Sequence, residues 1–176
     1  MRRRNISRIA LLVAVMAVTA QISFPLPLTG VPFSLQVLGV FLAGCLLDPA
    51  GAALALAAYL ALGVMGLPVF ARFGAGPGVL AGATGGYLIG FALAAPVVSW
   101  LARGGRQFGR NLLAMVLVLP LIYLPGVWRL AAFLPGGLEA AWAKGVVIFL
   151  PLDLIKAVLA AALGARISRA LAKSDR

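Results

Sequence analysis

The sequence has no histidine, one cysteine and four acidic residues among its 176 positions. Zinc sites take most of their ligands from cysteine and histidine, and an enzyme needs a nucleophile with a base, or a bound metal. We therefore expect no metal centre, no cofactor and no enzymatic activity. The single cysteine, Cys45, excludes an internal disulfide. Because it lies in an apolar run, we expect it to be a small buried side chain.

Charge of either sign is scarce, and apolar residues take its place. Charged residues form 11% of the chain and apolar residues 63%, against about 25% and about 45–50% in typical soluble domains. A soluble domain of this length could not bury so much apolar surface. The sequence therefore predicts one integral membrane domain over residues 1–176. Its net charge of +11 comes from basic residues at the ends of apolar runs, without the continuous patch that nucleic-acid binding requires.

Six apolar runs are long enough, or nearly so, to cross a bilayer as helices, which takes about 20 residues. Helices are expected because unpaired backbone groups are too costly in lipid, and no run alternates as barrel strands do. The predicted fold is an all-α bundle of six transmembrane helices. The expected spans are 6–24, 34–47, 50–65, 79–101, 111–132 and 143–167.

The basic residues predict how these spans are oriented. With six spans, the arginines before the first, between the fourth and fifth, and after the sixth all fall on one face, which the positive-inside rule makes cytoplasmic. Both termini are then cytoplasmic, and Arg72, Arg129 and Lys144 lie on the outer face. A cleaved signal peptide ending near Val18-Thr19-Ala20 is the alternative for the first run, and it would leave five spans.

Two outer connections are unusual. Residues 24–33 hold three prolines and no charge, so the loop is stiff and non-helical. It is either a plain hairpin or a lid over a cavity open to the outside. Residues 66–78 are rich in glycine and proline and carry Phe70, Arg72 and Phe73, and Thr84-Gly85-Gly86-Tyr87 follows. The adjacent glycines allow close approach of a ligand or a helix.

The most informative residues are Asp153 and Lys156 in the last span. Each charge at mid-helix costs about 2.5–3.5 kcal/mol on insertion scales, and a spacing of three lets the two pair on one helix face. Three interpretations stay open: a structural salt bridge, a proton relay, or an anchor for a polar uncharged group with a donor and an acceptor, such as a urea-like ring. Gln36, one turn into the second span, faces either the same cavity or a neighbouring helix.

Smaller signals concern packing. Ala10, Ala14 and Ala17 lie on one side of the first helix, where small residues let another helix approach closely. They serve either packing inside the bundle or docking onto another membrane subunit. Asp48, in Leu47-Asp48-Pro49, is expected to cap the third helix.

Four sequence blocks occur in order along the chain. They are Pro25-x-Pro27-x-Thr29-Gly30-Val31-Pro32-Phe33-Ser34-x-Gln36, Gly66-Leu67-Pro68-Val69-Phe70-Ala71, Thr84-Gly85-Gly86-Tyr87-Leu88-x-Gly90-Phe91 and Leu150-Pro151-x-Asp153-x-x-Lys156. These blocks resemble the BioY family, the biotin-binding S components of energy-coupling-factor (ECF) transporters, and the resemblance covers about residues 6–165. Two positions depart from the family pattern: Leu152, where glycine is expected, and Ala83, where proline is expected.

The resemblance implies the six-helix fold of ECF S components in a bacterial inner membrane, with biotin bound near the outer face. Asp153 and Lys156 would contact the ureido ring, and Ala10, Ala14 and Ala17 would dock on a transmembrane T component. Two cytoplasmic ABC ATPases would supply energy. The site expected from the resemblance and the residue chemistry comprises Asp153, Lys156, Gln36, Phe33, Phe70, Arg72, Thr84 and Tyr87, in which Arg72 either meets the carboxylate or is a solvated loop charge.

A second function stays open beside this one. A small bundle of this kind could also be a self-sufficient facilitator or a proton-coupled carrier for biotin or another vitamin, although no inverted repeat of the kind common in carriers is detectable. Uptake in a host without the energising subunits would separate the two. Whether the chain forms a homo-oligomer in the lipid bilayer is left open by the sequence.

Overall fold

The computed structural model describes residues 3–26, 29 and 31–174, and within this part the regular secondary structure is helical except for one short β-hairpin and an isolated β-bridge between Phe70 and Gly74. The arginines at 2 and 176 and the loop residues Pro27, Leu28 and Gly30 lie outside the described residues. The α-helices are α1 (Arg3–Gln21), α2 (Gln36–Leu46), α3 (Pro49–Val64), α4 (Pro77–Ala81), α5 (Gly85–Ala102), α6 (Phe108–Ala131), α7 (Gly137–Trp142) and α8 (Leu150–Ser174). A 3₁₀ turn, η1 (Ala71–Phe73), and a π turn, η2 (Ala143–Val147), complete the helical elements.

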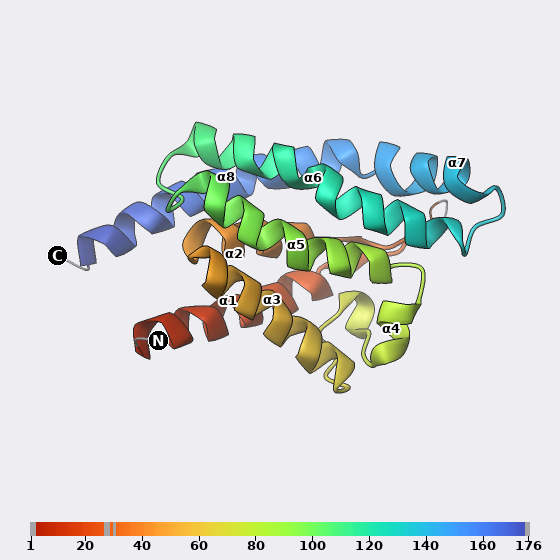
Figure 1. The fold of residues 1–176 in the computed structure, drawn as a ribbon, viewed down its shortest axis with the longest axis horizontal. Coiled ribbons are helices and arrows are strands. Elements are labelled where there is room, and N and C mark those ends of the chain that lie inside the picture. Colours follow the sequence, from red (N-terminus) through yellow and green to blue (C-terminus); the bar gives the residue numbers. More distant parts are fainter. Residues whose placement is uncertain (1–2, 27–28, 30, 175–176) are drawn as a thin grey trace.

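The helices form an elongated bundle, and both ends of the chain lie at the same end of its long axis (Figure 1). Helix α2 is central: it contacts α1, α5 and α8, and most of its residues are buried. The most extensive helix–helix interface is between α5 and α6. Glycine makes this contact possible, because a Cβ at Gly86 would lie 2.0 Å from the carbonyl oxygen of Pro125.

Among the described residues, three helices are long and apolar enough to cross a membrane by length and composition: Gly85–Ala102, Phe108–Ala131 and the continuous Gly137–Lys173. Three shorter apolar helices, Asn5–Gln21, Gln36–Leu46 and Pro49–Val64, coincide with the other expected spans. Each expected span thus overlaps a helix, and the all-helical fold is confirmed. The count of six membrane crossings stays a prediction, because the shorter helices fall below the length that spans a bilayer by itself.

The boundaries differ from expectation in three places. Helix α1 ends at Gln21 because Ser23 and Phe24 (β1) pair antiparallel with Ser34 and Phe33 (β2), which closes the loop between them. The expected fourth span from residue 79 is two helices, since the backbone is extended at Gly82 between α4 and α5. The last helix begins earlier, at residue 137, and passes through the π turn.

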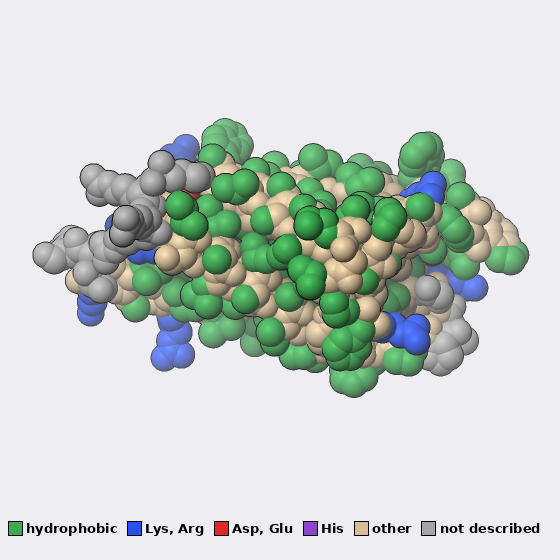
Figure 2. Space-filling model, turned by 90° about the horizontal axis from the view of Figure 1, so that it is seen from below, with side chains coloured by type: hydrophobic (Ala, Val, Ile, Leu, Met, Phe, Trp, Pro, Cys, Tyr) green, Lys and Arg blue, Asp and Glu red, His purple; other side chains and the backbone are tan. Residues whose placement is uncertain are grey.

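Side chains divide along the long axis. Figure 2 shows lysine and arginine at both ends of the visible face and hydrophobic side chains between them. Large apolar side chains on the helices, such as Leu11, Leu117 and Leu124, are 57–64% exposed. A soluble protein rarely shows so wide an apolar surface, so the middle zone is the part that faces lipid.

Two smaller expectations are confirmed. Asp48 is the N-cap of α3 and accepts a hydrogen bond from the backbone N–H of Gly51 at 3.3 Å. Cys45 is buried in the core with an exposed fraction of 2%.

Candidate binding site

A cavity lies in the half of the bundle that carries α4, between α2, α5, α6 and α8. The space open to the centre of a water molecule has a volume of about 140 Å³. The whole empty volume, including the part that opens to the outside, is about 780 Å³. The walls are mainly aromatic and aliphatic, with a few polar groups, as is usual for sites that bind small molecules. Helix α5 contributes Tyr87, Leu88 and Phe91, and the end of the loop before β2 contributes Val31 and Pro32.

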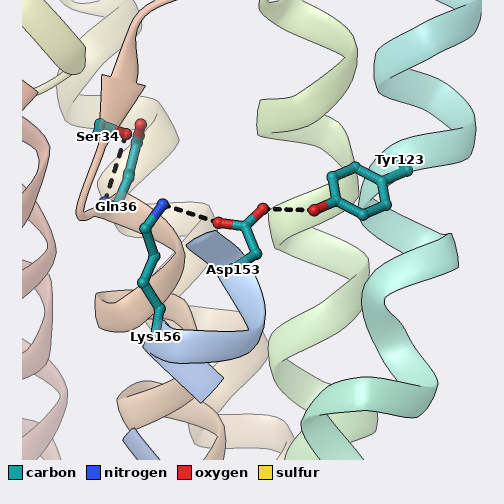
Figure 3. Close-up of polar contacts among 5 residues, drawn as sticks. All are labelled: Ser34, Gln36, Tyr123, Asp153 and Lys156. Atoms are coloured by element: carbon teal, nitrogen blue, oxygen red, sulfur yellow. Dashed lines mark hydrogen bonds and ion pairs between the residues drawn. The ribbon is translucent and has the colours of Figure 1, made fainter. Parts of the chain in front are cut away.

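The polar centre of the cavity is the pair of Asp153 and Lys156 on α8. The ammonium of Lys156 donates to Oδ1 of Asp153 at 2.7 Å, and both side chains are only 4% exposed. The hydroxyl of Tyr123, on α6, donates to Oδ2 of the same carboxylate at 2.6 Å (Figure 3). The expected pairing on one helix face is confirmed. Because a buried ion pair recovers its desolvation cost only when its remaining groups are satisfied, the tyrosine is part of what makes the pair tolerable.

This centre keeps hydrogen-bonding capacity that the described residues do not use. Lys156 has three N–H donors, and one of them is engaged, by Asp153. The ammonium also lies 4.2 Å from the ring centroid of Phe33, a cation–π contact that holds it from the loop side. A carboxylate has about four lone-pair sites, of which Asp153 uses one on each oxygen. The pair can therefore donate to a carbonyl and accept from an N–H of one ligand.

A second polar group enters the cavity from α2. Nε2 of Gln36 donates to the hydroxyl of Tyr59 at 2.6 Å, and this hydroxyl donates to the carbonyl oxygen of Val69 at 2.8 Å. Gln36 is 4% exposed and also lines the cavity. Gln36 therefore fits both of its expected roles. Its amide nitrogen binds Tyr59 on the neighbouring helix α3, and its side chain borders the cavity.

The aromatic walls are fixed by contacts behind them. The ring of Phe70 is 1% exposed and meets Tyr59 edge to face, with centroids 5.6 Å apart. The hydroxyl of Tyr87 donates to the carbonyl oxygen of Gly145 in the π turn at 3.1 Å. π turns occur often at functional sites, and this one meets a residue of the cavity wall.

The structure brings most of the expected site residues together. Those that line the cavity are Asp153, Lys156, Gln36, Phe70, Thr84 and Tyr87. Phe33 is absent from the lining and touches the site through Lys156. Arg72 is exposed, with a left-handed backbone (φ 59°), and does not border the cavity. Phe73 is 69% exposed beside it.

The expected docking residues lie on the outer side of α1. Ala10 and Ala14 are exposed and Ala17 is half-buried. The first two residues therefore contribute little to packing inside the bundle, which was one of the two interpretations of this set.

Tyr123 and Tyr59 are the site residues that sequence reasoning missed. Each is a hydroxyl in the middle of an apolar helix, a signal of the same kind as the buried charges but weaker, because tyrosine is common at membrane interfaces. Phe91, which closes the third sequence block, also lines the cavity, as do Ile122 and Phe149. Nothing distinguishes Ile122 and Phe149 in the sequence from other apolar residues.

Comparison with known proteins adds to this geometry. Residues 1–173 match the model of the BioY family. A biotin transporter BioY of Thermotoga maritima is 42% identical over 166 residues, which is 94% of this chain and 96% of the relative. A probable biotin transporter BioY of Pyrococcus horikoshii is 38% identical over 167 residues, covering 95% and 98% of the two chains.

One solved structure has the same fold. It is a crystal structure of the S-component for biotin from an ECF-type ABC transporter, with a TM-score of 0.86 and 23% sequence identity. The match covers 94% of this chain and 91% of the other. The arrangement of helices described above is therefore that of an ECF S component.

Proposed function

Because the chain belongs to the BioY family, we propose that it is the biotin-binding membrane subunit of an uptake system. The relatives that are similar over nearly their whole length are biotin transporters or probable biotin transporters. A member of this family is a transport protein rather than an enzyme, and its surface of exposed apolar side chains suits a membrane-integral chain.

The observation that carries the proposal is the Asp153–Lys156 pair inside an apolar cavity. Biotin joins an apolar bicycle to a ureido group, which has one carbonyl acceptor and two N–H donors. In the proposed complex the carbonyl accepts from Lys156 and an N–H donates to Asp153. Phe70, Tyr87 and Phe91 would cover the bicycle. Gln36 and Thr84 border the same space and would meet the remaining polar edge of the ligand.

The valerate carboxylate has no assigned partner in the cavity. Arg72 was expected as a candidate, and its side chain is exposed outside the lining. An exposed guanidinium near the mouth would contribute little to affinity, since solvent screens exposed ion pairs. We propose that the tail points toward the mouth and that the ureido end provides most of the recognition.

We propose that uptake is energised by a T component and two ABC ATPases. The chain has no nucleotide-binding motif of its own, so ATP can act only through partners. The exposed Ala10 and Ala14 on α1 offer the small side chains that allow another membrane helix to approach closely. Both chain ends lie at one end of the bundle, and the arginines of that end favour a cytoplasmic position in the inner membrane.

Biotin uptake in cells without their own transporter tests this proposal. Cells producing the chain together with the T component and ATPases should accumulate labelled biotin, and cells producing the chain alone should show only binding. Equal uptake by the chain alone would favour the facilitator or proton-coupled carrier instead, and sensitivity to a protonophore would separate those two.

A matched pair of variants tests the docking surface. Ala14→Leu adds volume on the exposed side of α1 and should abolish accumulation while leaving binding unchanged. Ala162→Leu makes the same change at an exposed position of α8 and should leave both unchanged. If Ala14→Leu accumulates biotin normally, the alanine side of α1 is not the docking surface.

A further inference from the structure

A second cavity lies at the opposite end of the bundle, the end that carries both chain termini. It is larger than the first, with about 410 Å³ open to water-molecule centres. Helices α1, α2, α5 and α8 and the loops after α2 and α5 form its walls. Nothing in the proposed binding of biotin uses this cavity, which shares no lining residue with the candidate site.

The cavity has a positive lining. Of the residues that the structure describes, Arg8, Arg103 and Arg106 border it, and Asp48 supplies the one carboxylate. That carboxylate already caps α3 through Gly51. Within the described part of the chain, no ion pair joins Arg103 or Arg106 to an acidic side chain. Two guanidinium groups at one cavity therefore have donors available for an anion.

Arg103, the first residue of the loop between α5 and α6, has an unfavourable backbone conformation. Arg103 has φ 47° and ψ 58°, and Gly104 and Gly105 continue with φ 88° and 68°. A non-glycine residue in this left-handed region is strained, because its Cβ crowds the following carbonyl oxygen. Glycine would relieve this strain, yet an arginine stands here and borders the cavity. Strained residues of this kind cluster at ligand-binding loops.

An unpaired hydroxyl lies beside the arginines. Ser168 on α8 borders the cavity and is 8% exposed, and its Oγ has no hydrogen-bond partner in the described structure. The hydroxyl lies against the same loop, since a Cβ on Gly105 would be 2.8 Å from it. A buried hydroxyl without a partner is unfavourable, because it has lost its hydrogen bonds to water without replacing them. An anion in the cavity would give it an acceptor.

The remaining walls are apolar. Leu46 and Leu171 border the cavity, and Trp100 stands at its edge with 69% of its surface exposed. Tryptophan concentrates at the level of lipid headgroups, so an exposed Trp100 beside the cavity suits a position where phosphate groups meet acyl chains. Basic pockets between transmembrane helices are a known way to hold anionic headgroups. We propose that this cavity binds the phosphodiester headgroup of an anionic phospholipid through Arg103, Arg106 and Ser168.

The test uses the full chain in nanodiscs of phosphatidylcholine doped with phosphatidylglycerol. Native mass spectrometry of the released protein counts the phosphatidylglycerol that stays bound. The double variant Arg103→Gln/Arg106→Gln should retain on the order of thirtyfold less, since each basic residue near a charged surface is worth about 1 kcal/mol and about 1.4 kcal/mol corresponds to tenfold. Ser168→Ala should reduce retention by a smaller factor.

The matched control is Arg166→Gln/Arg169→Gln, which removes the same charge from the exposed side of α8 outside the cavity. It should retain phosphatidylglycerol within about twofold of the parent if the site is specific. Thermal unfolding of both double variants shows whether either has lost its fold. The proposal would be overturned if both double variants lost bound phosphatidylglycerol to the same extent, or if the parent protein retained none. Displacement of the lipid by inorganic phosphate at similar concentration would overturn the lipid assignment and leave a soluble phosphate as the ligand.

Discussion

At the scale of single residues, the candidate site depends on a network of three side chains. Asp153 and Lys156 are close in sequence, so their pairing follows from helix geometry and was predictable. Tyr123 reaches the same carboxylate from a different helix, 30 residues away in the chain. Its role depends on how α6 packs against α8, which no local pattern encodes. The sequence therefore predicted the charges and not the hydroxyl that satisfies one of them.

Removing that hydroxyl should weaken ligand binding without destroying the fold. In Tyr123→Phe, Oδ2 of Asp153 loses its donor, and the carboxylate is held less firmly for the ligand. Interhelical hydrogen bonds in membranes average about 0.6 kcal/mol and reach about 1.7 kcal/mol, so biotin affinity should fall roughly three- to twentyfold. Isothermal titration of the purified chain measures this change.

The control for Tyr123→Phe is Ser99→Ala. It deletes a buried hydroxyl that donates to the carbonyl oxygen of Leu47 at 2.6 Å, at the other end of the bundle. Its affinity for biotin should match that of the parent. Equal weakening in both variants would mean that Tyr123 acts through general stability and not at the site.

At the scale of elements, hydropathy located every long helix and misjudged several ends. The break between α4 and α5 falls inside an apolar run. The extended backbone at Gly82 ends α4 there, although the hydropathy of the sequence does not change. The short hairpin of β1 and β2 also ends α1 earlier than its apolar character predicts. Boundaries depend on backbone conformation and long-range pairing, and the pattern of apolar residues records neither.

The α5–α6 contact offers a test at this scale. In Gly86→Ala the new methyl group would lie against the backbone of Pro125, so the two helices must separate. Overpacking of this kind costs about 1–3 kcal/mol. Because Tyr87 and Tyr123 lie on these two helices, biotin affinity should fall together with the thermal midpoint.

Gly109→Ala is the matched change. A Cβ at Gly109, in the first turn of α6, has no atom within 4 Å. Alanine is up to about 1 kcal/mol better than glycine in a helix, so this variant should be as stable as the parent or more so. A thermal midpoint for Gly86→Ala that equals that of Gly109→Ala would contradict the close packing described here.

At the scale of the whole molecule, the basic residues divide between the two ends of the bundle. Both ends of the chain lie at one end of the bundle, as an even number of crossings requires. The loop with Arg103 and Arg106 lies at this end, whereas Arg129 and Lys144 lie toward the other. The sequence predicted this asymmetry well because it depends only on the order of apolar runs and basic residues.

Cysteine labelling tests the orientation. In a Cys45→Ala background, Asn5→Cys, Glu139→Cys and Lys173→Cys each add a thiol at an exposed position. An impermeant maleimide applied to intact spheroplasts should label the protein with Glu139→Cys. It should label the other two only after the membrane is opened. Labelling of Asn5→Cys and Lys173→Cys from opposite sides would mean an odd number of crossings.

The central claim is that a buried ion pair in the cavity anchors biotin. Equilibrium binding of biotin to the purified chain, beside Asp153→Asn, Lys156→Met and the double variant, tests it most directly. Removing one partner leaves a buried charge and can cost about 3–5 kcal/mol of stability, so the double variant, which buries no unpaired charge, separates binding from folding. Asp48→Asn and Lys144→Met make the same changes away from the cavity.

We predict saturable binding by the parent and by both controls. Affinity should be at least tenfold lower in all three site variants, which corresponds to about 1.4 kcal/mol or more. Unchanged affinity in a folded double variant would make the pair structural and move the site elsewhere. No binding by the parent would contradict the assignment of biotin itself.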